Sequence, residues 1–557
     1  MAEFSWQWRN PLPQGNALRA VTYGAGKFVA VGQYGTIMSS SDGMNWVIEN
    51  SGTTNYLSGI AYANDLFVAV GMEGTLLTSP DGINWTARET GTDSWLDGVA
   101  YGNGLFVAVG QLGTILTSPD GENWSSTNVA AFWLNGVAYG QGRFVAVGTG
   151  GTIFTSEDGQ NWSSQGAFTQ FPLNSIVYSP DLFVVVGGGG TVLTSPDGKV
   201  WSSTNSNTTA YLEELTYGNG LFVAVGRDLD LNTGVVITSG DGRQWEAFLS
   251  DDYRLLLSVA AGPDGFVAVG LGGIILTSPD GVVWTMQSSG FYEELYGINY
   301  GLNRLVAVGA NGTILTSTDA SQWVQAESGS ENSLRDVEHA AETFLAVGDN
   351  GTILGSSDAV NWTLQPIEPS NRLNAAAYGE GQWVIVGAKG IVLTAANGQE
   401  WELQNSGTTV NLNGVAWGAG RWVAVGDQRT VLTSADGQEW VRQEAGTGSE
   451  VLQAVSYGQG QFAAVGDMGL VLTSPDAVTW EEQTIGGEDA PYWQGVNFCQ
   501  DQFIAVGPPG KAAFSADGQE WSVEATATDH FLNDAACDPQ GYIVVGDFGT
   551  ILQSSPS

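Results

Sequence analysis

The sequence predicts an all-β protein, a β-propeller of 14 four-stranded blades with about 39 residues in each blade. The first observation is a repeated unit, typified by residues 104–124, GLFVAVGQLGTILTSPDGENW, in which small and apolar residues alternate between glycines in the pattern of strands. The second is its recurrence, because 14 FVAVG-like segments follow one another at nearly constant spacing, and such a period is typical of propellers and solenoids. The third is that the two chain ends complement each other.

Each copy is expected to contain four strands. In the copy typified above, the strands are predicted at 96–102, 105–109 and 114–117, with a fourth strand opening at Trp124. A glycine-bounded turn separates the second and third strands, and the turn SPDG separates the third and fourth.

The last copy, YIVVGDFGTILQSSPS, stops before its fourth strand. The chain begins with SWQWRNPLPQGNALRAVTYG, which matches the fourth strand, loop and first strand of an internal copy. We therefore expect the N-terminal strand around Trp8 to close the last blade, because this arrangement leaves no sheet edge unpaired.

Propellers usually have about 4–8 blades, so the 14 blades favour two rings of seven. The expected domains are a first propeller at 17–290 (blades 1–7) and a second at 291–557 plus 1–16 (blades 8–14). A single ring of 14 blades is the alternative, since no linker marks the midpoint of the chain.

The hairpin turn reads S-x-D-[GA]-x-x-W in 12 of 13 copies. A carboxylate at this position can accept hydrogen bonds from the amides of its own turn, and the tryptophan can bury a large face between blades. Alanine replaces the glycine at 320, 359 and 477, which indicates a position that does not need positive φ. We expect a structural role for the turn aspartates Asp42, Asp81, Asp120, Asp158, Asp197, Asp241, Asp280, Asp319, Asp358, Asp436, Asp476 and Asp517.

This motif resembles the Asp-box, or BNR, repeat of sialidases, sortilin-type receptors, two-propeller xyloglucanases and photosystem II assembly factors of the Ycf48 type. It has one residue fewer than the usual repeat between the aspartate and the tryptophan. The resemblance covers nearly the whole chain and implies a propeller in which the box is a structural turn on the face away from ligands. It implies no single function, because these proteins include both binding scaffolds and glycosidases.

Composition excludes several classes of function. The formal net charge of −41, with 17 basic residues, excludes nucleic acid as a partner. No apolar stretch is long enough for membrane insertion, and no signal peptide is visible, so the sequence as written is cytoplasmic, or extracytoplasmic if it is a mature form. We expect a monomer without cofactors, in which Cys499 and Cys537 are free thiols rather than a bridge.

Catalytic motifs are not found. Two histidines, His339 and His530, do not favour a histidine metal site or a catalytic triad, and no spacing singles out a carboxylate pair. Asp228, Asp230 and Asn232 in the insertion DLDLNTG are weak candidates for a calcium loop, and a solvated acidic loop is the favoured interpretation.

The predicted site is the loop face, formed by the loop before each first strand and the loop between each second and third strand. Aromatic side chains in these loops suit stacking on a glycan or a contact with a protein, although they could instead cap the core between blades. The sequence thus favours a non-catalytic scaffold that binds a protein or a glycan; the alternative is a two-propeller glycoside hydrolase with carboxylates in a cleft between rings. The candidate ligand-binding residues are Tyr56, Trp95, Trp133, Tyr211, Tyr253, Tyr292 and Trp493.

Overall fold

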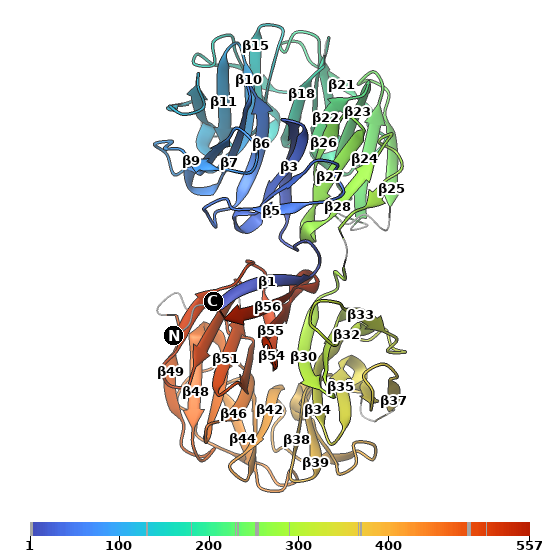
Figure 1. Cartoon of the computed structure of the whole chain (residues 1–557), viewed down its shortest axis with the longest axis vertical. Coiled ribbons are helices and arrows are strands. Elements are labelled where there is room, and N and C mark those ends of the chain that lie inside the picture. Colours follow the sequence, from blue (N-terminus) through green and yellow to red (C-terminus); the bar gives the residue numbers. More distant parts are fainter. Residues whose placement is uncertain are drawn as a thin grey trace. The chain divides into compact units, whose positions relative to one another are not determined.

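The computed structural model describes residues 4–556 except 130–131, 180, 229, 231–232, 251–254, 289, 366, 368–369, 487–491 and 508. These residues form 14 four-stranded antiparallel sheets, which confirms the predicted fold class (Figure 1). In 13 sheets, the four strands follow chain order, and we number these blades 1–13 along the chain. Blade 14 has the order β1-β56-β55-β54. No helix among the described residues is long and apolar enough to cross a membrane.

The first strands of blades 1–7 line one cavity and those of blades 8–14 line another, and in each blade the second strand pairs with the first. The first strands are β2 (Leu18–Gly24), β6 (Leu57–Ala63), β10 (Leu96–Gly102), β14 (Leu134–Gly140), β18 (Leu173–Tyr178), β22 (Tyr211–Gly218), β26 (Leu256–Gly262), β30 (Leu295–Gly301), β34 (Leu334–Ala340), β38 (Leu373–Gly379), β42 (Leu412–Gly418), β46 (Leu452–Gly458), β50 (Gly495–Cys499) and β54 (Leu532–Asp538). The second strands are β3 (Lys27–Gly32), β7 (Leu66–Gly71), β11 (Leu105–Gly110), β15 (Arg143–Gly148), β19 (Phe183–Gly187), β23 (Leu221–Asp228), β27 (Gly265–Gly270), β31 (Arg304–Gly309), β35 (Thr343–Gly348), β39 (Gln382–Gly387), β43 (Arg421–Gly426), β47 (Gln461–Gly466), β51 (Gln502–Gly507) and β55 (Gly541–Gly546).

The third and fourth strands complete each blade, and most fourth strands are short, which leaves little open edge for pairing with another chain. The third strands are β4 (Ile37–Ser40), β8 (Leu76–Ser79), β12 (Thr114–Ser118), β16 (Thr152–Ser156), β20 (Val192–Ser195), β24 (Thr233–Ser239), β28 (Ile275–Ser278), β32 (Ile314–Ser317), β36 (Ile353–Ser356), β40 (Val392–Ala395), β44 (Thr430–Ser434), β48 (Leu470–Ser474), β52 (Lys511–Ser515) and β56 (Ile551–Pro556). The fourth strands are β5 (Val47–Glu49), β9 (Thr86–Ala87), β13 (Ser125–Asn128), β17 (Ser163–Ala167), β21 (Ser202–Thr204), β25 (Glu246–Ser250), β29 (Thr285–Met286), β33 (Val324–Ala326), β37 (Thr363–Gln365), β41 (Glu402–Gln404), β45 (Val441–Arg442), β49 (Glu481–Thr484), β53 (Ser522–Ala525) and β1 (Phe4–Asn10).

The chain divides into two compact units, Gly15–Ser289 and Met1–Gln14 with Gly290–Ser557, which we call the N-unit and the C-unit. In the N-unit, the first strand of blade 1 contacts that of blade 7, and the amide of Val21 donates to Ser258 Oγ at 3.1 Å. In the C-unit, β30 contacts β54, and Asn533 Nδ2 donates to the carbonyl of Leu295 at 2.8 Å. The first and seventh blades of each unit are therefore in contact, as neighbouring blades are.

The N-terminal strand completes the last blade, as the sequence predicts. β1 pairs antiparallel with β56, and Trp8 lies opposite Leu552. Trp8 is buried, and Phe4 stacks near Phe514 with ring centroids 4.8 Å apart. The closing strand thus contributes both backbone pairing and apolar side chains to the core between blades 13 and 14.

Glycine at the end of a first strand allows an aromatic ring of the next blade to pack directly on the backbone. A Cβ added at Gly102 would lie 2.0 Å from Cγ of Tyr139, so no side chain fits there. The same contact joins Gly24 with Tyr62, Gly140 with Tyr178, Gly379 with Trp417, Gly418 with Tyr457 and Gly458 with Phe498. This contact explains the glycine that ends most first strands and the aromatic residue that precedes it.

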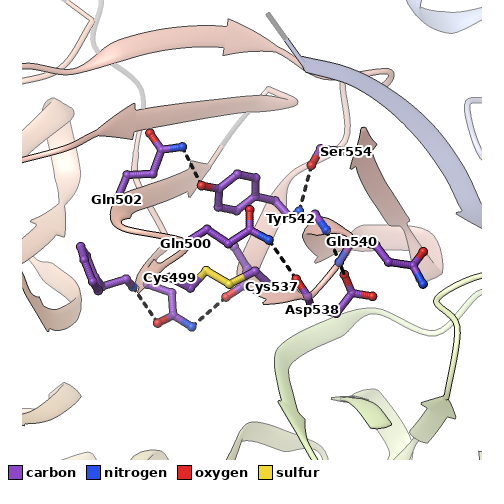
Figure 2. Close-up of a disulfide and its surroundings, with 12 residues drawn as sticks. Cys499, Gln500, Gln502, Cys537, Asp538, Gln540, Tyr542 and Ser554 are labelled. Atoms are coloured by element: carbon purple, nitrogen blue, oxygen red, sulfur yellow. Dashed lines mark hydrogen bonds between the residues drawn. A yellow bond between two sulfur atoms is a disulfide. The ribbon is translucent and has the colours of Figure 1, made fainter. Parts of the chain in front are cut away.

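The expectation of two free thiols is wrong, because Cys499 and Cys537 form a disulfide (Figure 2). Cys499 ends β50, where most other first strands end in glycine, and Cys537 of β54 takes the place of the aromatic residue. The two cysteines differ by one residue in repeat position, and this is the offset at which the glycine and the aromatic ring of adjacent blades meet. The bridge therefore replaces the glycine–aromatic contact between blades 13 and 14.

The inference that the glycine of the SPDG turn needs no positive φ is also wrong. Gly82 has φ of +72°, and the substituted residues Ala320, Ala359 and Ala477 keep the same conformation, with φ of 59°, 61° and 64°. The three alanines thus adopt the left-handed region at a cost of about 1 kcal/mol each, which the rest of the turn must offset.

Candidate functional site

The turn aspartates are occupied by their own turns. Asp81 Oδ1 accepts the backbone N–H groups of Ile83 and Asn84, both at 2.9 Å, and Ser79 Oγ accepts the amide of Gly82 at 2.8 Å. The bonds from the Asn84 and Ile83 backbone lower the pKa of the Asp81 carboxyl well below its usual range. The tryptophan that follows usually donates its indole N–H to a turn carbonyl, as Trp124 does to Gly121 at 3.0 Å.

All 12 turn aspartates accept two such backbone bonds. The pairs of bonds involve Asp42, Asp81, Asp120, Asp158, Asp197, Asp241, Asp280, Asp319, Asp358, Asp436, Asp476 and Asp517. A carboxylate that satisfies its own turn has little capacity for a ligand, so these turns are not the candidate site.

Three predicted aromatic residues form a continuous array on the loop face of the N-unit. Tyr56, Trp95 and Trp133 directly precede the first strands of blades 2, 3 and 4. The ring centroids of Tyr56 and Trp95 are 5.6 Å apart, as are those of Trp95 and Trp133, and both pairs meet edge to face. We call these three residues the aromatic array.

Hydrogen bonds from the indole N–H groups and to the backbone hold the array in place. Trp95 Nε1 donates to Ser58 Oγ at 2.5 Å, and Trp133 Nε1 donates to a carboxylate oxygen of Asp97. The backbone carbonyl of Trp95 accepts the amide of Gln111 at 2.7 Å, which ties it to the loop between the second and third strands. The rings are half-buried and fixed, so one part of each remains available at the surface.

A cavity of about 600 Å³ lies beside the array at the centre of the N-unit. Its wall carries charged groups from the first strands together with two of the predicted aromatic residues: Arg19, Asp97, Trp133, Tyr211, Glu213 and Glu214. A cavity of this size with aromatic and polar walls is typical of a ligand site.

Two arginines balance the carboxylates of the N-unit cavity. Glu213 lies 3.2 Å from Arg227 Nε and 3.7 Å from Arg19 Nη2, and the Arg227 guanidinium lies 5.4 Å from the ring centroid of Tyr211. Glu214 accepts a hydrogen bond from Ser175 Oγ. Burial raises the pKa of Asp97 to about 6 and also raises that of Glu214, whereas the nearby charge of Arg19 lowers both.

Of the other predicted aromatic residues, Tyr211 lines the N-unit cavity, and Tyr292 and Trp493 belong to the C-unit. Trp493 is fully buried in the core between blades 12 and 13, at the position where other first strands begin with leucine, so its proposed role as an exposed ligand contact is wrong. Tyr292 is half-buried in the C-unit, and Tyr253 lies outside the described residues.

The weak metal candidates gain no support. The amide of Asp230 donates to Asp228 Oδ1 at 2.9 Å in an exposed turn, and Asn232 lies outside the described residues. Among the residues that the structure describes, no group of three or more acidic, histidine or cysteine side chains could hold a metal ion. His530 is buried, and its Nδ1 forms a hydrogen bond with Thr550 Oγ1 at 2.7 Å. The rings of His339 and Phe344 pack with their centroids 4.6 Å apart, so both histidines have structural roles.

Sequence reasoning missed a group of carboxyls at the centre of the C-unit. Asp336 and Glu338 on β34 and Asp534 on β54 line a cavity of about 480 Å³. Asp336 and Asp534 stand at the third position of their first strands, where β10 and β14 have Gly98 and Gly136. Aligning the 14 first strands by position would have revealed these acids as departures from the repeat.

Comparisons with solved structures agree with the propeller fold. No protein-family model matches the sequence, and no curated protein matches it. The chain is similar to a solved structure of an ancestral GH74 enzyme, with a TM-score of 0.71, 12% identity and 99% of each chain covered. It is also similar to PorZ, a bacterial surface component of the type-IX secretion system of Porphyromonas gingivalis, with a TM-score of 0.67 and 12% identity over 98% of this chain and 86% of that one.

A third similarity is to YCF48 from Cyanidioschyzon merolae, with a TM-score of 0.41 and 17% identity over 48% of this chain and 96% of that one. At these identities, the first two comparisons establish a shared β-propeller fold and nothing about function.

Proposed function

We propose that this chain is a non-catalytic binding propeller that engages a protein or glycan partner through the loop face of the N-unit. The observation that carries the proposal is the aromatic array of Tyr56, Trp95 and Trp133 beside the charged cavity. Fixed aromatic rings bind with little loss of conformational entropy, which suits both sugar stacking and protein contacts.

The loops also support a binding role, because they are where the repeated blades differ. The turn aspartates form the same bonds in 12 of the 14 blades, whereas residues before the first strands vary from Trp95 and Trp133 to Arg372 and Asn411. Variable loops on a rigid repeated scaffold are the usual location of specificity.

A glycoside hydrolase is the second candidate, and one observation favours it. Burial raises the pKa of Glu338 to about 8, and that of Asp534 also to about 8, so either could be a protonated acid at neutral pH, as a general acid must be. However, Asp534 accepts hydrogen bonds from the backbone amides of Ile298 and Ala535, and Glu338 accepts one from Asn299 Nδ2. These partners fit a role in joining blades better than a role in bond cleavage.

The test is a binding screen of the full chain against immobilised neutral oligosaccharides and against a set of basic and neutral peptides. The variant Trp95→Ala/Trp133→Ala/Tyr211→Ala should lose at least tenfold in affinity for any probe that binds the parent, since aromatic truncations at binding sites commonly cost more than 1 kcal/mol each. Tyr492→Ala, which removes an exposed aromatic ring of the C-unit, is the matched control and should bind as the parent does.

The dependence of binding on ionic strength distinguishes a protein partner from a glycan partner. Association with a basic peptide should slow as ionic strength rises, whereas stacking on a neutral sugar should change little. If the triple variant folds normally by calorimetry and still binds each parent ligand with unchanged affinity, the proposed site is wrong. Hydrolysis of an oligosaccharide by the parent, lost in Glu338→Gln, would favour the enzyme instead.

A further inference from the structure

The centre of the C-unit contains three carboxyl groups that form no ion pair with a described residue. Asp336, Glu338 and Asp534 line the same cavity, and we call them the carboxyl trio. None of them forms an ion pair within the part of the chain that the structure describes. The corresponding carboxylates of the N-unit lie beside Arg19, as described above.

The trio joins four consecutive blades. Asp534 Oδ2 of blade 14 accepts the amide of Ile298 in blade 8 at 2.9 Å, and Asp336 Oδ2 of blade 9 accepts the amide of Ala376 in blade 10 at 2.8 Å. Glu338 Oε2 of blade 9 accepts Asn299 Nδ2 of blade 8 at 2.8 Å. The three groups therefore bridge the joint between blades 14 and 8 and the two blade contacts that follow it.

Other ionisable groups on the cavity wall do not neutralise the trio. Arg335 on β34 bonds Asp349 at 2.8 and 3.1 Å and stacks 4.5 Å from the ring centroid of Tyr296 on β30, while Arg372, before β38, is exposed. β38 contributes Tyr378 and β46 contributes Tyr457 to this wall, whereas β42 and β50 contribute no titratable group.

We propose that the carboxyl trio is a pH-sensitive joint, which holds blades 14, 8 and 9 together when protons are shared among the three groups and loosens when all three ionise. Three like charges in one partly enclosed cavity repel each other, and water screens them poorly there. The strands that carry them are the ones that the repulsion pushes apart.

The direction of the pH effect follows from the pKa of each group. Burial raises the pKa of Asp336 to about 6, and burial together with the charges of Asp336 and Asp534 raises that of Glu338 to about 8. Burial and the charge of Asp336 raise the pKa of Asp534 to about 8. Because the folded chain binds these protons more tightly than the unfolded chain, their stabilisation is fully present below the ordinary carboxyl pKa of about 4 and is lost as pH rises through about 8.

Hydrogen exchange of the full-length protein, followed by mass spectrometry, tests this joint. Labelling at pH 5, 7 and 9, with times scaled for the intrinsic exchange rate, should show at least a tenfold loss of protection in β30, β34 and β54 between pH 5 and pH 9. A shift of one pKa unit corresponds to a tenfold change, so tenfold is a conservative expectation. β2 and β22 in the N-unit are the internal reference and should lose less. Burial raises the pKa of Asp97 and of Glu214 as well, but the charge of Arg19 opposes both increases.

Two variants complete the experiment. Glu338→Gln keeps an oxygen for Asn299 and carries no charge, so it should remove most of the pH-dependent loss in the C-unit. Glu214→Gln, the matched change in the N-unit, should leave the C-unit unaffected. Equal protection of the C-unit at pH 5 and pH 9 would overturn the proposal, as would a loss that Glu338→Gln does not reduce. If that variant does not fold, the pH series on the parent alone decides between these outcomes.

Discussion

The centres of the N-unit and the C-unit are built from the same strand positions and differ in charge. In the N-unit, Glu213 lies between Arg19 and Arg227, and the cavity opens beside the aromatic array. In the C-unit, Asp336, Glu338 and Asp534 have backbone and amide partners, without a cation among the described residues. Both cavities are similar in size, at about 600 and 480 Å³.

The difference shows which strand positions can vary in sequence from blade to blade. Second strands are almost fully buried and nearly invariant, as in Phe106, Val107 and Val109, because they fill the core between blades. Polar first-strand side chains on the cavity wall, such as Glu214, Asp336 and Asp534, are not part of these cores, so they can vary without loss of the fold. One scaffold can therefore carry a balanced, aromatic-rimmed cavity in one unit and an acidic cavity in the other.

The largest expected effect concerns the closure of the C-unit. Deleting residues 1–12 removes β1 and should lower the free energy of unfolding of the C-unit by about 5 kcal/mol or more, since losing buried Trp8 alone costs about 3–5 kcal/mol. The N-unit should keep its own transition in calorimetry. A variant that lacks only residues 1–3 keeps β1 and is the control; unchanged melting of the longer deletion would contradict the closure seen here.

The disulfide offers a second difference, because both cysteines of the chain lie in the C-unit. The variant Cys499→Ala/Cys537→Ala should have a free energy of unfolding about 2–4 kcal/mol lower than that of the parent, as expected for the loss of one disulfide. Cys499→Gly/Cys537→Tyr recreates the glycine–aromatic contact of the other blades and should recover part of that loss. Urea unfolding with and without reductant measures both effects, and a parent that is indifferent to reductant would show that the bridge adds nothing.

The smallest effect concerns the SPDG-type turn. Its positive-φ position is glycine in the N-unit copies, as at Gly82, and alanine in three C-unit copies, as at Ala320. In the C-unit, Ala320→Gly relieves a left-handed alanine but loses a buried methyl group, so we expect a change within about 1 kcal/mol. In the N-unit, Gly82→Ala places a Cβ 2.8 Å from Val29 Cγ2 and should destabilise by about 1–2 kcal/mol. Thermal unfolding compares them, and equal losses from both substitutions would contradict the requirement for positive φ.

Much of the fold was predictable from the sequence, because the repeat encodes strands and turns locally. The 14 blades, the closing strand around Trp8 and the hairpin turns follow from residue spacing. The disulfide was mispredicted, because contacts between blades join residues one position apart in the repeat. Trp493 was misassigned, because a tryptophan in a leucine position cannot be told from a loop tryptophan without the packing of its neighbours.

The candidate site was only partly predictable. Its array members were recognisable as aromatic residues in variable loops, but their edge-to-face order and the bonds of Trp95 and Trp133 depend on how adjacent blades are placed. The carboxyl trio joins residues about 200 positions apart, and only ring closure brings β54 beside β30.

Under the proposed function, a partner binds over the aromatic array of the N-unit. Fluorine NMR of the full chain labelled with 5-fluorotryptophan tests it directly, with the Trp95 and Trp133 signals assigned from Trp95→Phe and Trp133→Phe variants. On titration with any oligosaccharide or peptide that binds in the screen, these two signals should shift, while those of the turn tryptophans, such as Trp245 and Trp284, should stay in place. Binding that leaves the Trp95 and Trp133 signals unmoved would contradict the account.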